Sequence, residues 1–297
     1  MKDVASGHVA PPLPPPRLLE AAHRAMSARL ERCPQGALRV GVDLGTAYVV
    51  VMVTDELGLP LVGASRFASV VRDGVVVDFA GAISIVRELV GEVEDRLGVR
   101  LETAATTYPP GVAAAEVQAT RYVVEAAGLE CTGLVDEPTA ANAVLGIRDG
   151  AVVDIGGGTT GIAVLRGGDV IHVADEATGG THVTLVVAGA LGLSFDEAEI
   201  RKVDPASQAQ LLPVVRPVFE KIATIVARNL SGHPVGTVHL VGGTAAFTGM
   251  ADVVAAEIGR KARVPSYPLL VTPLGVALHD VGGAARFPLE ALEVGHG

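Results

Sequence analysis

The 297-residue sequence contains no tryptophan, two cysteines and four lysines. Cys33 and Cys131 are too few for a disulfide framework, so they indicate a reducing compartment. No H-E-x-x-H motif or metal-ligand spacing of cysteines and histidines is present. No lysine follows a glycine, and this excludes the phosphate-binding P-loop, which requires G-K-[ST].

Long apolar runs are also missing. No stretch reaches the ~18 uninterrupted apolar residues of a membrane span, and the N-terminal MKDVASGHVAPPLPPP lacks the apolar centre of a signal peptide. Apolar residues make up 49% of the chain and charged residues 19%, which is an ordinary globular composition. The formal charge of −10 argues against nucleic acid and anionic membrane surfaces as partners. We therefore expect a cytoplasmic protein of about two domains.

What the chain does contain is glycine, and the stretch AVVDIGGGTTGIAVL at 151–165 concentrates it. Gly156, Gly158 and Gly161 match the G-x-G-x-x-G fingerprint of a dinucleotide-binding turn. That fingerprint must lead into a helix, whose N-terminus holds the pyrophosphate. Here GIAVLRGGDVIHVAD follows, which predicts two strands joined by a Gly-Gly turn. The Rossmann interpretation is therefore rejected.

A second stretch, RVGVDLGTAYVVVMV at 39–53, has the same design. Each copy is an apolar strand closed by an aspartate (Asp43 or Asp154), a Gly/Thr turn and a further strand. The pair indicates a duplicated domain. Glycines let successive backbone N–H groups converge on phosphate oxygens without a lysine. We expect the two turns to face each other across a cleft and hold a triphosphate, with Asp43 and Asp154 flanking Mg²⁺ through its waters.

The rest of the chain alternates hairpins and helices, a mixed α/β architecture. We expect three parts: a proline-rich linker and amphipathic helix at 1–36, a first lobe at 37–150 against which 272–290 packs back, and a second lobe at 151–271. The helix RLLEAAHRAMSARLE presents Leu18, Ala22, Met26 and Leu30 on one face. It either docks on its own core or tethers a partner.

Five segments in order resemble the actin/Hsp70/sugar-kinase ATPase superfamily. DLGT and DIGGGTTGIAV are similar to its two phosphate loops, DEPTAA and VTPLGVAL to its two connecting elements, and LVGGTAAFTG to its adenosine motif. The resemblance implies an actin/Hsp70-like (RNase H-like) duplicated two-lobe fold, and the short spacers imply reduced peripheral subdomains. More closely, VVRDGVVVDFAGAISIVREL, ATTYPPGV, ADEATGGTHVTLVVAG and VRPVFEKIATIVARNLSG are similar to a family of ethanolamine utilization proteins.

The resemblance also implies roles for individual residues. Asp43 and Asp154 would organise Mg²⁺, and Glu137 would orient the attacking water. The phosphates of ATP would lie against Gly45, Thr46, Gly156, Gly157, Gly158, Thr159 and Thr160, and the nucleoside against Gly180, Glu199, Lys202, Gly242, Gly243 and Thr244. Two alternatives stay open: Glu199 and Lys202 can be an exposed i,i+3 ion pair, and Glu137 can be an acid favoured by a helix N-terminus.

The chain departs from the Hsp70 pattern in two ways. It has no lysine between Lys2 and Lys202 to reach the γ-phosphate, and it ends soon after VTPLGVAL, so we expect no peptide-binding domain. We therefore expect slow ATP hydrolysis by a chaperone-like or assembly factor for ethanolamine utilization. Its protein client would be an ethanolamine ammonia-lyase or components of a bacterial microcompartment. An actin-like filament, a metabolite kinase of the same fold and a nucleotide-binding scaffold without turnover are the alternatives.

Overall fold

The structure is a computed structural model that describes residues 13–72 and 74–282. The chain divides into two compact units. Among the described residues, the first comprises 13–72, 74–108, 112–145 and 270–282, and the second comprises 109–111 and 146–269. Residues 270–282 thus belong to the first unit, while the expected boundary residues 283–290 lie outside the described part.

The first unit contains a five-stranded sheet in the order β3-β2-β1-β6-β7. Its strands are β1 (Leu38–Leu44), β2 (Tyr48–Asp55), β3 (Pro60–Phe67), β6 (Thr103–Tyr108) and β7 (Glu130–Asp136). β1, β2 and β3 form an antiparallel meander, whereas β6 and β7 run parallel to β1. The hairpin expected at 39–53 is confirmed. β3 was not predicted, because its sequence PLVGASRF mixes glycine, serine and arginine into the strand.

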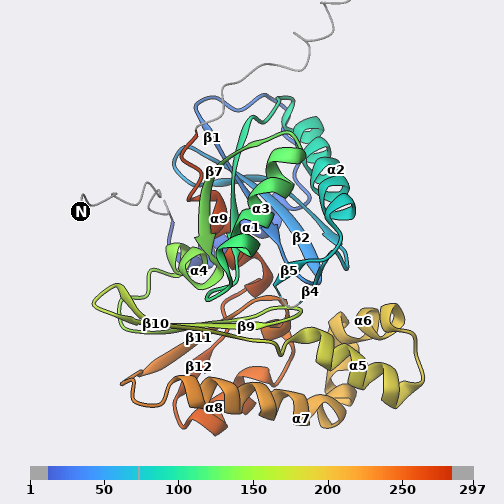
Figure 1. The fold of residues 1–297 in the computed structure, drawn as a ribbon, viewed down its shortest axis with the longest axis vertical. Coiled ribbons are helices and arrows are strands. Elements are labelled where there is room, and N and C mark those ends of the chain that lie inside the picture. Colours follow the sequence, from blue (N-terminus) through green and yellow to red (C-terminus); the bar gives the residue numbers. More distant parts are fainter. Residues whose placement is uncertain (1–12, 73, 283–297) are drawn as a thin grey trace, which may run out of the picture. The chain divides into compact units, whose positions relative to one another are not determined.

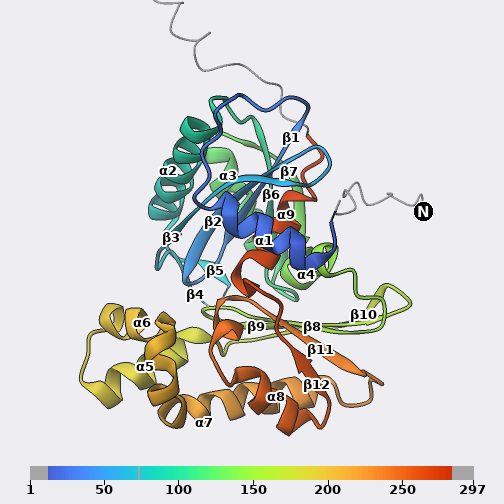
Figure 2. The ribbon, with the colours of Figure 1, turned by 180° about the vertical axis from the view of Figure 1, so that it is seen from behind.

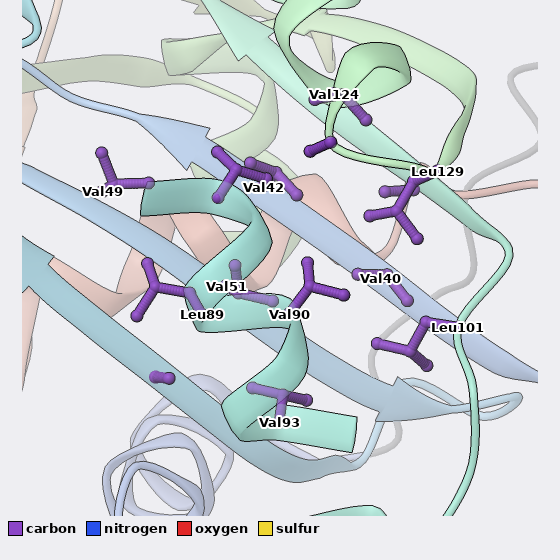
Figure 3. Packing of buried hydrophobic residues seen from close by; sticks show 14 of the residues in the cluster. Val40, Val42, Val49, Val51, Leu89, Val90, Val93, Leu101, Val124 and Leu129 are labelled. Atoms are coloured by element: carbon purple, nitrogen blue, oxygen red, sulfur yellow. The ribbon is translucent and has the colours of Figure 1, made fainter. Parts of the chain in front are cut away.

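Two helices, α2 (Phe79–Leu97) and α3 (Ala114–Ala126), pack against this sheet (Figure 1). The Asp78 side chain accepts a hydrogen bond from the Gly81 amide at the start of α2, and Gly98, with φ +75°, ends the helix in the left-handed conformation. Leu89, Val90 and Val93 of α2 meet the valines of β1 and β2 (Figure 3). The 3.6-residue spacing of these apolar side chains made α2 predictable.

Two more helices of the first unit are α4 (Glu137–Leu145) and α9 (Val271–Ala277). α9 packs closely on both β1 and α4. A Cβ atom at Gly41 of β1 would lie 2.4 Å from the Ala277 nitrogen of α9. A Cβ atom at Gly275 of α9 would lie 1.8 Å from the Ala140 carbonyl oxygen of α4. Both distances are far shorter than any van der Waals contact, so these glycines are required for the packing of α9 on β1 and α4.

The N-terminal helix α1 (Pro15–Ala25) packs against β3 (Figure 2), with Leu18, Leu19 and Ala22 fully buried. It docks on its own core, as one of the two expectations held. It ends earlier than expected. The Arg96 guanidinium donates to the Ala25 carbonyl at the end of the helix at 2.9 Å, and to the Ala28 carbonyl beyond it at 2.8 Å. The proline-rich residues 9–12 lie outside the described part of the chain.

Between β3 and α2 the chain forms only a small two-stranded sheet, β4 (Val71–Arg72) and β5 (Val75–Val76). Of the expected Asp-Gly turn, Asp73 lies outside the described residues, and Gly74 has φ +78°. This short insertion fits the expectation of a reduced peripheral subdomain.

The second unit repeats the plan of the first. Its sheet has the order β10-β9-β8-β11-β12, with β8 (Gly150–Ile155), β9 (Thr160–Arg166), β10 (Asp169–Glu176), β11 (Thr237–Val241) and β12 (Lys261–Arg263). The first three strands again form an antiparallel meander, and β11 and β12 again run parallel to the first strand. The shared strand order confirms the duplication inferred from the two glycine turns.

The helices of the second unit are α5 (Gly180–Leu191), α6 (Phe195–Val203), α7 (Pro205–Asn229) and α8 (Met250–Ile258), with short 3-10 turns η1 (Gly243–Ala246) and η2 (Pro268–Leu270). α7 starts earlier than its apolar pattern indicated: the Asp204 side chain accepts from the Ala206 amide, so Pro213 and Pro217 lie inside the helix. Phe219 of α7 packs edge-to-face on Phe247, with 5.1 Å between ring centroids. Within the described ranges, no helix combines the length and hydropathy needed to cross a membrane.

Candidate nucleotide-binding site

The two aspartates singled out in the sequence occupy matching places in the two sheets. Asp43 is the next-to-last residue of β1 and pairs with Val50 of β2, and Asp154 is the next-to-last residue of β8 and pairs with Gly161 of β9. β1 and β8 are the central strands of their sheets. Asp154 is 6% exposed and Asp43 is half-buried. Each unit therefore presents one carboxylate at the end of its central strand.

In the first unit, the turn after β1 contains Gly45 and Thr46. A Cβ atom at Gly45 would lie 2.7 Å from the Tyr48 carbonyl oxygen, so glycine is needed to close this turn. β1, β6 and β7 are parallel neighbours, so Asp43 lies at the same carboxyl edge of the sheet as the end of β7. Glu137 follows β7 directly and is the first residue of α4.

The residue that caps α4 is Asp136, which directly precedes Glu137. The side chain of Asp136 accepts a hydrogen bond from the Thr139 amide at 3.0 Å, which is the role of a helix N-cap. Burial and the nearby Asp136 carboxylate raise the pKa of Tyr108, which pairs with Asp136 across β6 and β7. Sequence reasoning missed Asp136 as the capping residue, although an aspartate just before a first turn that contains Pro138 is a usable signal.

In the second unit, the glycine-rich turn 156–160 joins β8 to β9, and hydrogen bonds hold both its first and its last residue. The Gly156 amide donates to the Thr159 carbonyl at 3.0 Å, which closes the turn. Thr160 is fully buried, and its hydroxyl donates to the Thr178 carbonyl at 2.6 Å. Thr159 is 7% exposed. We call residues 156–160 the phosphate loop from here on, after the role that the sequence predicts for them.

The start of α5 lies directly against the phosphate loop. The Gly180 amide donates to the Gly156 carbonyl at 2.9 Å, and the Thr181 amide donates to the Gly157 carbonyl at 2.7 Å. A Cβ atom at Gly179 would lie 2.8 Å from both of those loop carbonyls. Residue 179 is therefore a glycine because the loop backbone fills the space where a side chain would begin.

Glu199 and Lys202 of α6 form a buried pair, so the alternative of an exposed ion pair is wrong. They are 5% and 7% exposed, and the Lys202 Nζ lies 2.6 Å from the Glu199 Oε2. The hydroxyl of Thr184 on α5 donates to the same Glu199 oxygen at 2.5 Å, and the Lys202 ammonium donates to Thr184 at 3.0 Å and to the Gly180 carbonyl at 3.3 Å. Burial lowers the pKa of Lys202, and the Glu199 carboxylate opposes this shift.

The adenosine-motif residues Gly242, Gly243 and Thr244 follow β11 and enter η1. Gly242 has φ +86°, and a Cβ atom there would lie 2.3 Å from Oδ1 of Asp154. The Thr244 hydroxyl donates to the Gly156 carbonyl at 2.8 Å. The fold of the second unit thus gathers the phosphate loop, Gly180, Glu199, Lys202 and residues 242–244 around one place. Thr184 was missed, since a threonine inside an apolar helix carries no sequence signal.

The expected Mg²⁺ carboxylates, Asp43 and Asp154, belong one to each unit. Among the described residues, no group of three or more histidine, cysteine, aspartate or glutamate side chains is arranged to hold a metal directly.

Comparisons with known proteins identify the family of this chain. The family model described as type IV pilus assembly protein PilM matches residues 111–267, just over half of the chain. The ethanolamine utilization protein EutJ of Escherichia coli (strain K12) is 41% identical over 263 residues, covering 88% of this chain and 92% of the relative. The chain belongs to the EutJ family. It also falls within the wider domain family that the PilM model describes.

The crystal structure of EutJ from Carboxydothermus hydrogenoformans has a TM-score of 0.83 and 47% identity, and covers 89% of this chain and 98% of that one. The crystal structure of MreB 5 of Spiroplasma citri bound to AMPPNP has a TM-score of 0.67 at 17% identity, covering 82% and 95%. That level of identity shows the fold alone. The expected membership among ethanolamine utilization proteins and the actin/Hsp70-like fold are both confirmed.

Proposed function

We propose that this EutJ-family protein binds ATP with Mg²⁺, hydrolyses it slowly, and uses the nucleotide state to act as a chaperone-like or assembly factor in ethanolamine utilization. The observation that carries the proposal is the gathering, within the second unit, of the phosphate loop, the buried Glu199–Lys202 pair and Thr244. Chain segments separated by dozens of residues meet there through backbone contacts that require glycine.

ATP binding follows from the chemistry of the loops. Backbone N–H groups of a glycine turn are fixed partial positive charges that bind phosphate oxygens. Gly45–Thr46 in the first unit and the phosphate loop in the second are such turns, and we propose that both contact one ATP. The polar groups of Glu199 and Lys202 suit the hydroxyls of a ribose. In the solved MreB 5 structure of the same fold the bound molecule is AMPPNP, which supports a nucleoside triphosphate here.

The two strand-end carboxylates would hold Mg²⁺ through its waters, and the metal would neutralise charge on the phosphates. Glu137, at the start of α4, would accept a hydrogen bond from the attacking water and orient it. No lysine lies between Lys2 and Lys202, so the first unit has no lysine among its described residues to stabilise the γ-phosphate. We therefore propose slow turnover, suited to a timed switch rather than to metabolic flux.

The client is proposed from the names of the relatives, which are ethanolamine utilization proteins. We propose that the protein partner is an enzyme of that process, such as an ethanolamine ammonia-lyase, or a component of its microcompartment, and that the two proteins meet in the cytoplasm.

The alternative of an actin-like filament draws on the MreB fold. Light scattering with and without ATP separates the two: ATP-dependent polymer supports the filament, and its absence supports the factor.

The decisive experiment is a calorimetric titration of ATP and Mg²⁺ into wild type and Asp154→Asn, with phosphate release followed on the same samples. Asp169→Asn, an exposed aspartate on β10 of the same unit, is the matched control. We expect wild type and Asp169→Asn to bind at micromolar affinity or better, and Asp154→Asn to bind at least about tenfold more weakly, a loss of ~1.4 kcal/mol. A wild type that binds no nucleotide would overturn the proposal.

A further inference from the structure

The side chain of Thr244 is directed at the backbone of the phosphate loop. Thr244 is 6% exposed, and its hydroxyl donates to the Gly156 carbonyl at 2.8 Å. Gly156 is the first residue of the loop and lies 88 positions earlier in the chain. A residue that the family resemblance would place against the nucleoside is thus bonded to the segment expected to hold the phosphates.

The bond from Thr244 belongs to a set that fixes the orientation of the loop peptides. The Gly156 carbonyl also accepts from the Gly180 amide, and the Gly157 carbonyl accepts from the Thr181 amide. In a planar trans peptide the C=O and the following N–H point in opposite directions. With their carbonyls held by α5 and Thr244, these two peptides therefore direct the amides of Gly157 and Gly158 to the opposite side. Converging amides of this kind bind anions.

The absence of a side chain at Gly180 leaves room for the Thr244 hydroxyl. A Cβ atom at Gly180 would lie 2.4 Å from the Thr244 hydroxyl oxygen, so the hydroxyl occupies the place where a side chain at 180 would begin. The Gly180 carbonyl in turn accepts from the Lys202 ammonium at 3.3 Å. Thr244, Gly180 and Lys202 are therefore connected to Gly156 by one network of hydrogen bonds.

We infer that Thr244 is a positioning residue: it orients the phosphate loop through the Gly156 carbonyl, and does not act mainly by touching the nucleoside. The inference rests on the proposed ATP binding. It predicts that loss of the Thr244 hydroxyl weakens the binding of the phosphates while leaving the binding of adenosine itself nearly unchanged. If Thr244 instead contacted the nucleoside directly, loss of its hydroxyl would weaken the binding of ATP and of adenosine equally.

The first arm of the test needs no nucleotide. Hydrogen exchange followed by mass spectrometry is compared for wild type, Thr244→Val, Thr244→Ser and Thr248→Val, at the amides of Gly156, Gly180 and Thr181. Thr248→Val is the control, because its hydroxyl donates to the side chain of Gln208 and not to the loop. We expect exchange at least about tenfold faster in Thr244→Val only. Exchange like that of wild type would overturn the inference.

The second arm titrates ATP with Mg²⁺, and separately adenosine, into the same four proteins. We expect ATP affinity to fall about tenfold in Thr244→Val, with adenosine affinity within about twofold of wild type and with the serine variant restored. Equal losses for ATP and adenosine would overturn the inference. A wild type that binds neither ligand would overturn the proposed function, whereas the exchange arm would still decide whether Thr244 holds the loop.

Discussion

The hydroxyl of Thr132 on β7 donates a hydrogen bond of 2.5 Å to the carboxylate of Asp280, which is fully buried. The same carboxylate accepts from the Val40 amide of β1 at 2.9 Å and from the Thr103 hydroxyl of β6 at 3.2 Å. The Gly282 amide is a fourth donor, at 3.0 Å. One side chain beyond α9 therefore ties the C-terminal segment to three strands of the first sheet.

Replacing Asp280 by asparagine should destabilise the protein, because both carboxylate oxygens accept hydrogen bonds and an amide has only one acceptor oxygen. The NH₂ group of the asparagine would face groups that are themselves hydrogen-bond donors. Hydrogen bonds to a charged group contribute about 1.5–3 kcal/mol, so we expect a loss of about 3 kcal/mol in the free energy of unfolding. Urea unfolding measures it, with the exposed Asp95→Asn on α2 as control. The same urea midpoint for both variants would show that the buried Asp280 carboxylate does not stabilise the first unit.

The close crossing of α4 and α9 predicts a severe effect of a single methyl group. In Gly275→Ala the new Cβ would meet the Ala140 carbonyl, which is backbone and can move only with its helix. Overpacking of this kind costs about 3 kcal/mol. Gly91→Ala on α2 is the matched control, because a Cβ atom there would have no atom within 4 Å apart from its chain neighbours and the backbone of its own helix. The control should gain about 0.5–1 kcal/mol from helix propensity. Equal melting temperatures for the two variants would contradict the crossing.

Removing Lys202 should leave the Glu199 carboxylate buried without its cation. Breaking a buried ion pair costs about 3–5 kcal/mol, so Lys202→Met should be strongly destabilised. The double variant Glu199→Gln/Lys202→Met should recover much of that loss, since no charge is then buried. Arg216→Met is the comparison, because its pair with Glu220 is exposed and contributes about 0–1 kcal/mol. A loss in Lys202→Met no larger than in Arg216→Met would argue against a buried pair.

Glu137→Ala separates binding from hydrolysis. If Glu137 orients the attacking water, ATP affinity should stay within about threefold of wild type while phosphate release falls about 100-fold. Glu116→Ala, an acid in the first turn of α3, controls for the loss of a negative charge at a helix N-terminus. Phosphate release at the wild-type rate in Glu137→Ala would assign Glu137 to helix stability alone.

His239 should make stability depend on pH. Burial, and then the Arg263 guanidinium beside it on β12, lower the pKa of this imidazole. The unfolded chain then binds the proton more tightly than the folded one, so stability is lost as pH falls below about 6.5 and through the lowered pKa. His239→Gln should flatten this loss between pH 7 and 5 in urea midpoints, whereas the exposed His23→Gln should not. If the urea midpoints of wild type and His239→Gln fall equally with pH, His239 is not the cause of the loss of stability.

Much of the architecture could be predicted because it depends on local pattern. The two hairpins with their terminal aspartates, and the long helices with 3.6-residue apolar spacing, were visible without any tertiary information. β3 was missed because an edge strand is held by its pairing with β2 and does not need an apolar sequence. The early end of α1 was missed because the contacts there come from distant residues: Arg96, 71 positions later, donates a hydrogen bond to the Ala25 carbonyl.

The sequence by itself determined the duplicated plan and the residue types of the candidate site, since strand periodicity, glycine turns and closing aspartates act over a few neighbouring residues. Only the tertiary structure decided that Glu199 and Lys202 are buried and that Thr244 is bonded to Gly156. Burial and long-range hydrogen bonds depend on which segments pack together. That is a property of the whole folded unit, and no window of sequence contains it.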